Sequence, residues 1–171
     1  CDREALDITD IAQIRQVLAT TKPDIVLNCA AYNDVEESED SGKESCFDIN
    51  TMAVSHLAEA THELKIDFIT ISTDYVFDGS QDTYSEDDIP QPPSNYGESK
   101  YRGERFARSE HPASVIIRTS WLYGGIEEHK SFVTTMLALA ESGVTPRVVD
   151  NQFSSATYTV DLARALIQVI D

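Results

Sequence analysis

Phe68-Ile69-Thr70-Ile71-Ser72 is the stretch that decides the fold, because its apolar run is typical of a buried strand. Two similar runs lie at Ile25-Val26-Leu27 and Val115-Ile116-Ile117, and amphipathic helical patterns separate the three. Strands that alternate with helices require crossover connections, which give a parallel sheet with helices on both faces. The sequence therefore predicts an α/β fold built on a doubly wound parallel sheet.

Helices are expected wherever apolar residues recur at helical spacing. They are predicted from Thr9-Asp10 to Lys22-Pro23, from about Ser45 to Leu64, from Tyr96 to about Ser109, around Phe132–Ala140 and around Leu162–Ile170. A short strand is also expected at Arg147-Val148-Val149. The acidic connection from Asp74 to Ser94 is expected to run over the surface.

Composition narrows the class of protein. The chain has 171 residues, enough for one domain, and its 13 basic and 30 acidic side chains give a net charge of −17. This charge argues against nucleic acid or an anionic membrane as a partner, because phosphates would be repelled. No apolar run approaches the ~18 residues of a membrane helix, so a cytoplasmic protein is expected. Cys1, Cys29 and Cys46 lack metal-ligand spacing, so reduced thiols and no metal site are expected.

Tyr96 and Lys100 are the first candidate catalytic residues. They lie four positions apart at the start of a predicted helix, so both side chains project from the same helical face. A nearby cation favours the phenolate and lowers the pKa of a tyrosine, which makes Tyr96 a candidate general acid. A pair with this spacing also occurs by chance on many solvated helices, so it needs support from other residues.

That support comes from polar residues that follow the predicted strands. Such residues lie at 28–31, at 72–75 and at 118–121, each directly after an apolar run. Ligands of doubly wound sheets bind outside the carboxyl ends of the strands. A ligand site is therefore expected where these three segments meet.

Five sequence blocks together resemble the extended short-chain dehydrogenase/reductases, and most closely the dTDP-4-dehydrorhamnose reductases. The blocks are Asn-Cys-Ala-Ala-Tyr at 28–32, Ser-Thr-Asp-Tyr-Val-Phe-Asp-Gly at 72–79, Tyr-Gly-Glu-Ser-Lys at 96–100, Arg-Thr-Ser-Trp-Leu-Tyr-Gly at 118–124, and Asp-Asn-Gln-Phe at 150–153 with Thr157-Tyr158. Their order and spacing make this resemblance far more specific than the tyrosine and lysine pair alone. It implies a Rossmann-like domain that binds NADPH or NADH and a nucleotide-sugar substrate.

The resemblance implies a catalytic role for three residues. Tyr96 would give a proton to the C4 carbonyl oxygen of the sugar while the nicotinamide supplies a hydride. Lys100 would hold the nicotinamide ribose hydroxyls and lower the pKa of Tyr96. Thr73 would hydrogen-bond the carbonyl oxygen as charge develops on it.

Binding roles are implied for a wider set. Ala30, Ala31 and Tyr32 would line the cofactor channel, and Asp7 with Ile8 would lie beside the adenine. Substrate contacts are expected from Thr73, Asp74, Trp121 and Gln152.

Two features depart from the family pattern. No glycine precedes Gly42, so the glycine-rich first βαβ unit that holds the pyrophosphate is expected to be missing, and family members continue beyond Asp171. The substrate-side turn at 154–156 is Ser-Ser-Ala, where the family usually has a Gly-Ser-Pro-like sequence. We therefore expect residues 1–171 to form a partial NAD(P)-binding domain that lacks most of the C-terminal substrate domain. Such a fragment would be poorly stable and inactive alone, and a homo-oligomer is one way to stabilise it.

Two alternative functions remain open from the sequence. A sugar-nucleotide epimerase or dehydratase has the same fold and the same three residues, and Asp74 partly meets a dehydratase's need for an acid after the threonine. A non-catalytic NADP-binding subunit, similar to the β-subunit of methionine adenosyltransferase, is the other. The sequence leaves open the choice between NADH and NADPH.

Overall fold

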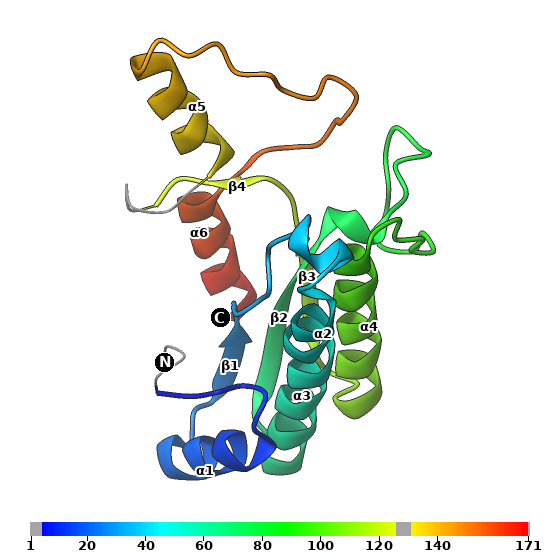
Figure 1. Cartoon of the computed structure of the whole chain (residues 1–171). Helices are drawn as coiled ribbons and strands as arrows, with labels where there is room; N and C mark the ends of the chain where they lie inside the picture. Colours follow the sequence, from blue (N-terminus) through cyan, green and yellow to red (C-terminus); the bar gives the residue numbers. More distant parts are fainter. Residues whose placement is uncertain (1–4, 126–130, 171) are drawn as a thin grey trace. The chain divides into compact units, whose positions relative to one another are not determined.

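The computed structural model describes residues 5–125 and 131–170. It forms two compact units, the first ending at Arg118 and the second beginning at Thr119 (Figure 1). A three-stranded sheet belongs to the first unit and a two-stranded sheet to the second. The candidate catalytic residues Thr73, Tyr96 and Lys100 all lie in the first unit.

The first unit alternates helices and strands as the sequence predicts. Its elements are α1 (Ile11–Thr21), β1 (Ile25–Asn28), the 3-10 helix η1 (Glu37–Glu39), α2 (Lys43–Phe47), the π-helical turn η2 (Asp48–Met52), α3 (Ala53–Leu64), β2 (Asp67–Thr73), the 3-10 helix η3 (Asp74–Val76), α4 (Asn95–Glu110) and β3 (Val115–Thr119). The strand order is β1-β2-β3, and β1 runs parallel to β2 with Asn28 opposite Thr70. The predicted α/β fold with parallel strands is confirmed.

Helix ends follow the local sequence. Asp10 caps α1 by accepting hydrogen bonds from the backbone N–H groups of Ala12 and Gln13. Lys22 ends the same helix in a left-handed conformation. The helix predicted from about Ser45 to Leu64 is present as one helical run, α2-η2-α3, with a π-helical turn in its middle.

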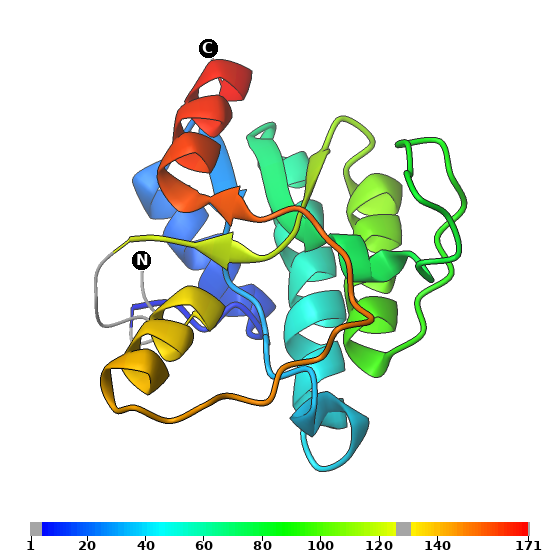
Figure 2. The same ribbon diagram turned by 90° about the horizontal axis from the view of Figure 1, so that it is seen from above.

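One hydrophobic core joins the helices to the sheet in the first unit. It contains Ile14 and Leu18 of α1, Val54 and Leu57 of α3, Phe68 of β2 and Ala107 of α4. Helices α3 and α4 run side by side in both views (Figures 1 and 2). The predicted burial of β1 is only partly correct, because Leu27 is 37% exposed on this outer strand of the described sheet.

Phe68 is the largest fully buried side chain of this core, with 1% of its surface exposed. We expect Phe68→Ala to lower the free energy of unfolding by about 3–5 kcal/mol, because the truncation leaves a cavity in a packed interior. Urea denaturation followed by circular dichroism measures the change. Leu64→Ala is the matched control, since Leu64 is 43% exposed; equal losses in both variants would contradict the assignment of the core.

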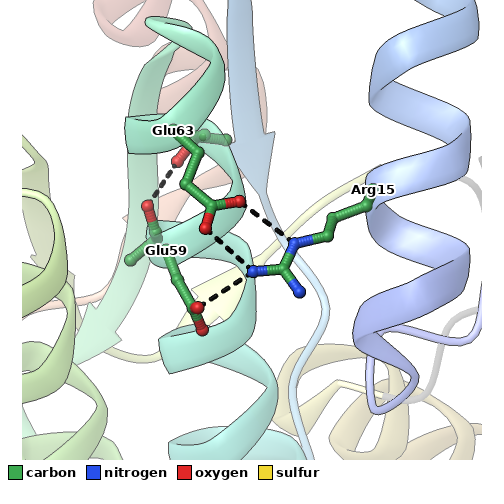
Figure 3. A network of polar contacts seen from close by, with 5 residues as sticks. Arg15, Glu59 and Glu63 are labelled. Atoms are coloured by element: carbon green, nitrogen blue, oxygen red, sulfur yellow. Dashed lines mark hydrogen bonds and ion pairs between the residues drawn. The ribbon is translucent and has the colours of Figure 1, made fainter.

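A polar contact between α1 and α3 lies on the surface. The Arg15 guanidinium binds both carboxylate oxygens of Glu63, at 2.9 and 3.1 Å, and one oxygen of Glu59 at 2.9 Å (Figure 3). All three side chains are at least two-fifths exposed, so solvent and salt screen the interaction. The network supports the packing of the two helices without determining it.

The second unit contains α5 (Phe132–Glu141), α6 (Thr159–Ile170) and a parallel pair of short strands, β4 (Leu122–Tyr123) and β5 (Thr157–Tyr158). Both helices were predicted. The strand predicted at Arg147–Val149 is wrong, because this segment has no regular secondary structure and Val149 is 68% exposed. A run of β-branched residues becomes a strand only where a partner accepts its hydrogen bonds.

Among the described helices, none combines the length and the apolar character needed to span a bilayer. Within the same residues, no three His, Cys, Asp or Glu side chains are grouped so that they could hold a metal ion.

Candidate active site

The end of β2 and the first turn of α4 bring the candidate catalytic residues together. Thr73 is the last residue of β2, and its side chain lies close enough to Tyr96, in the first turn of α4, to lower the pKa of the phenol. Lys100, one turn further along α4, donates a hydrogen bond of 2.7 Å to the backbone oxygen of Ile71 on β2. The three side chains therefore converge on the carboxyl end of one strand.

The backbone at Thr73 is held by its own side chain. Thr73 Oγ1 accepts a hydrogen bond of 3.2 Å from the Tyr75 N–H and donates one of 3.3 Å to Asp74 Oδ1. The Tyr75 ring meets the Tyr96 ring edge to face, with centroids 5.8 Å apart. These contacts place the Thr73 hydroxyl, the Asp74 carboxylate and the Tyr96 phenol in one polar cluster.

Tyr96 is a weaker acid in the structure than the sequence predicts. Burial raises the pKa of its phenol above the ordinary value, and the hydrogen bond with Thr73 only partly opposes this effect. The net shift is therefore opposite to the lowering expected from Lys100, because the cost of burying a phenolate is the largest influence on this group. Tyr96 is consequently protonated at neutral pH, the state from which a phenol donates a proton.

Lys100 is the more strongly perturbed group. Its side chain is 5% exposed, and burial lowers the pKa of its ammonium to about 8, against the opposing influences of the Glu104 carboxylate and of Cys46. A lysine with this pKa loses its charge within one or two pH units of neutrality. Strongly shifted pKa values cluster at functional sites, so this lysine is a candidate functional residue.

Gly97 allows the first turn of α4 to lie against η3. A Cβ atom built on Gly97 would collide with the backbone oxygen of Tyr75.

We expect Gly97→Ala to shift Tyr96 away from Thr73 and to lower kcat/KM by up to about 10²-fold, since small displacements of catalytic groups have effects of that size. Steady-state kinetics measure the loss. Gly79→Ala controls for a general effect of glycine replacement near the site; Gly79 has nothing within 4 Å of a built Cβ, although its φ of +74° adds local strain. Full activity in Gly97→Ala would refute the close-packing argument.

The segment after β1 is fixed by two asparagines. Asn28 accepts a hydrogen bond from the Ala30 N–H at 3.1 Å. Asn50 of the π-helical turn accepts from the Tyr32 N–H at 2.9 Å and donates to the Tyr32 backbone oxygen at 3.0 Å. The backbone of the expected cofactor channel at 30–32 is thereby held in one conformation.

Asn50 also joins this segment to the helix that carries Tyr96. Its amide donates a hydrogen bond of 3.0 Å to Ser99 Oγ, which in turn donates to the Tyr96 backbone oxygen at 2.7 Å. Cys46 Sγ lies 3.2 Å from the same Ser99 hydroxyl. No role was predicted for Asn50 or Ser99 from the sequence. The available signal was an asparagine, a poor helix former, inside an otherwise apolar helical pattern.

Other expected cofactor contacts have structural partners of their own. The Tyr32 hydroxyl donates a hydrogen bond of 2.5 Å to Glu37, which raises the pKa of Tyr32 to about 12. Asp7 Oδ1 accepts from the N–H and the hydroxyl of Thr9, at 2.9 and 2.7 Å. Ile8 packs against the hydrophobic core. Asp7 and Ile8 thus lie at the turn that leads into α1.

Trp121 and Gln152 belong to the second unit. Trp121 is 44% exposed, has a positive φ of 42° and lies near the Phe132 ring, with centroids 6.4 Å apart. Its backbone oxygen accepts a hydrogen bond from Thr157 at 3.2 Å, next to the β4-β5 pair. Gln152 is exposed in the irregular segment before β5.

A nicotinamide ribose is compatible with the donors at Lys100. An ammonium has three donors, and the hydrogen bond to Ile71 uses one of them, so two remain for vicinal hydroxyls among the described contacts. The protonated phenol of Tyr96 and the hydroxyl of Thr73 supply a proton donor and a hydrogen-bond donor on the same side. The residues present therefore fit a nicotinamide cofactor with a carbonyl substrate beside it.

Comparisons with known proteins agree with this arrangement. The chain is 39% identical over 171 residues to dTDP-4-dehydrorhamnose reductase of Aggregatibacter actinomycetemcomitans, covering 99% of this chain and 57% of that protein. It is 39% identical to the spore coat polysaccharide biosynthesis protein SpsK of Bacillus subtilis, covering 98% of this chain and 58% of that protein. The crystal structure of dTDP-4-dehydrorhamnose reductase from Bacillus anthracis in complex with NADP is 37% identical, with a TM-score of 0.95, and covers 99% of this chain and 60% of that one.

The chain thus spans between half and two thirds of the length of these relatives. The sequence model of one family, described as the RmlD substrate binding domain, matches residues 1–171. Since the match covers every residue, the chain belongs to the RmlD substrate binding domain family.

Proposed function

We propose that the intact protein containing this chain reduces the C4 ketone of dTDP-4-dehydrorhamnose to dTDP-L-rhamnose with NADPH or NADH. The observation that carries the proposal is the cluster at the carboxyl end of β2, where the Thr73 hydroxyl lies beside the Tyr96 phenol and Lys100, one helical turn further along α4, donates to the Ile71 backbone oxygen. The names of the relatives support the substrate, and the NADP complex of the Bacillus anthracis enzyme supports the cofactor class.

The reaction adds a hydride to carbon and a proton to oxygen. A bound reduced nicotinamide supplies the hydride. Tyr96 donates its phenolic proton to the carbonyl oxygen, and the resulting phenolate is stabilised by the nearby Lys100 ammonium. Thr73 donates a hydrogen bond to the same oxygen while negative charge develops on it. Solvent later returns the proton to Tyr96, which completes the balance of one hydride and one proton for each ketone.

The binding roles form part of the same proposal. The cofactor is bound by Lys100 and Tyr96, along the 30–32 segment, and near Asp7 and Ile8. The substrate is bound by Thr73, Asp74, Trp121 and Gln152. The proposal also takes residues 1–171 as a partial NAD(P)-binding domain.

The proposal is tested with the intact protein and purified dTDP-4-dehydrorhamnose. We expect the absorbance of NADPH or of NADH to fall with one cofactor oxidised per sugar, and the comparison of the two gives the cofactor preference. Tight NADPH binding without turnover would reject the reductase and favour a regulatory subunit.

The epimerase or dehydratase alternative has one structural observation in its favour. Asp74 Oδ1 accepts a hydrogen bond from Thr73, so a carboxylate lies beside the proposed carbonyl site. An enzyme of either type regenerates its oxidised cofactor in each turnover. Conversion of a nucleotide sugar without net consumption of NADPH or NADH would therefore identify this alternative.

A further inference from the structure

Helix α4 contains two buried side chains of opposite charge one turn apart. Lys100 and Glu104 are each 5% exposed. Opposite charges at positions i and i+4 of a helix commonly pair with each other. In this helix they bind other partners, because the Lys100 ammonium donates to the Ile71 backbone oxygen at 2.7 Å and Glu104 pairs with Arg118 of β3.

The pair between Arg118 and Glu104 uses both oxygens of the carboxylate. Arg118 Nε donates to Glu104 Oε1 at 2.9 Å, and Arg118 Nη2 donates to Glu104 Oε2 at 2.7 Å. Two parallel charge-assisted bonds fix the orientation of a carboxylate as well as its position. Both oxygens of the Glu104 carboxylate are therefore occupied by Arg118 of β3.

Arg118 is itself held from a second side. Its guanidinium carbon lies 5.0 Å from the centroid of the Phe77 ring. That ring stacks on Tyr84 with centroids 4.3 Å apart, and the Tyr84 hydroxyl donates to Asp78 at 2.7 Å. The arginine thus connects β3, α4 and the loop that follows η3, and its place in the structure does not depend on Glu104 alone.

We propose that Arg118 is a positioning residue for Lys100: by engaging both oxygens of Glu104 it prevents that carboxylate from pairing with the Lys100 ammonium, which stays on β2 beside Tyr96. This inference rests on the proposed function, in which Lys100 holds the cofactor ribose. Arg118 itself is proposed to touch neither the substrate nor the cofactor. Its effect passes through Glu104 to Lys100.

The charges around Lys100 determine the sign of each expected change. Glu104 on the same helix and Cys46 on α2 favour the charged form of Lys100 and raise its pKa. Burial has the larger effect and lowers the pKa to about 8. Asp74 and Tyr75 raise the pKa of the neighbouring Tyr96, and Glu86 and Tyr101 raise the pKa of Arg118. Removal of Arg118 would leave the Glu104 charge unbalanced and raise the pKa of Lys100. Removal of Glu104 would leave the Arg118 cation unbalanced and lower it further.

The experiment measures the Lys100 titration directly in the intact protein without cofactor. The protein is labelled with 13C-lysine, the Cε resonances are followed by NMR between pH 6 and pH 11, and Lys100→Arg identifies the Lys100 signal. We expect Arg118→Gln to move the midpoint upward, and Glu104→Gln to move it downward, each by about one pH unit. The double variant should lie between the two. Arg15→Gln is the matched control, because it removes the same charge from an exposed network and should leave the midpoint unchanged.

Opposite shifts separate this role from a merely structural one, since general loosening of the site would move both variants toward the ordinary lysine value. Shifts in the same direction, or no shift in folded variants, would overturn the proposal. If Arg118→Gln does not fold, the midpoints of Glu104→Gln and the double variant decide, because the double variant must titrate at the higher pH. A wild-type protein with no reductase activity but with these shifts would reject the proposed function alone. An active enzyme without the shifts would reject only the role of Arg118.

Discussion

Tyr96→Phe should lower kcat by about 10²–10⁴-fold, the usual contribution of a positioned general acid. The variant removes one oxygen atom and keeps the ring, so the edge-to-face contact with Tyr75 is retained. Burial raises the pKa of Tyr96, so the wild-type phenol stays protonated at and above neutral pH. Most of the loss should therefore fall on the chemical step, and the affinity for the reduced cofactor should weaken only by the contribution of the one hydrogen bond that the phenol offers it.

The measurement combines steady-state kinetics with cofactor binding followed by fluorescence in the intact protein. Tyr101→Phe is the matched control, because Tyr101 lies on the same helix and has no role in the proposed reaction. Wild-type turnover by Tyr96→Phe would show that another group supplies the proton. Equal losses in both variants would indicate damage to α4 in place of lost acid catalysis.

Lys100→Met should lower kcat/KM by about 10²–10³-fold, comparable with the loss of one charged donor at a developing oxyanion. The methionine fills the buried space along the helix but offers no donors to a ribose and no charge to a phenolate. Lys43→Met, an exposed lysine at the start of α2, is the matched control and should be fully active. Unchanged cofactor affinity in Lys100→Met would contradict the ribose contact.

The same lysine predicts a pH dependence in the wild type. Its pKa is lowered to about 8, so the ammonium is charged below that value and neutral above it. Affinity for the reduced cofactor should therefore be full below pH 8 and fall as the pH rises through it, whereas Lys100→Met should bind weakly at every pH. The stability of the folded protein changes with pH in the opposite direction to the cofactor affinity. Between the folded pKa near 8 and the ordinary value of 10.5, the unfolded chain binds more protons at Lys100, so stability contributed by this group rises with pH.

Local sequence signals predicted most of the elements correctly. The N-cap of α1 at Asp10 was predicted from its side chain type, and each of the three main strands lies within a few residues of the apolar run that predicted it. The segment at Arg147–Val149 shows where such signals fail. Its β-branched residues resemble a strand, but strand formation needs a partner from elsewhere in the chain, and β4 pairs with β5 instead.

Local sequence patterns were sufficient to predict that Thr73, Tyr96 and Lys100 lie near the end of β2. Strand periodicity places Thr73 at the carboxyl end of a strand, and helical spacing places Tyr96 and Lys100 on one face. The charge states and the partners of these side chains depend on the tertiary structure. Burial raises the pKa of Tyr96 and lowers that of Lys100, and Glu104 pairs with Arg118 across the fold. The physical reason is that desolvation and ion pairing depend on distances between segments far apart in the chain, which local patterns do not encode.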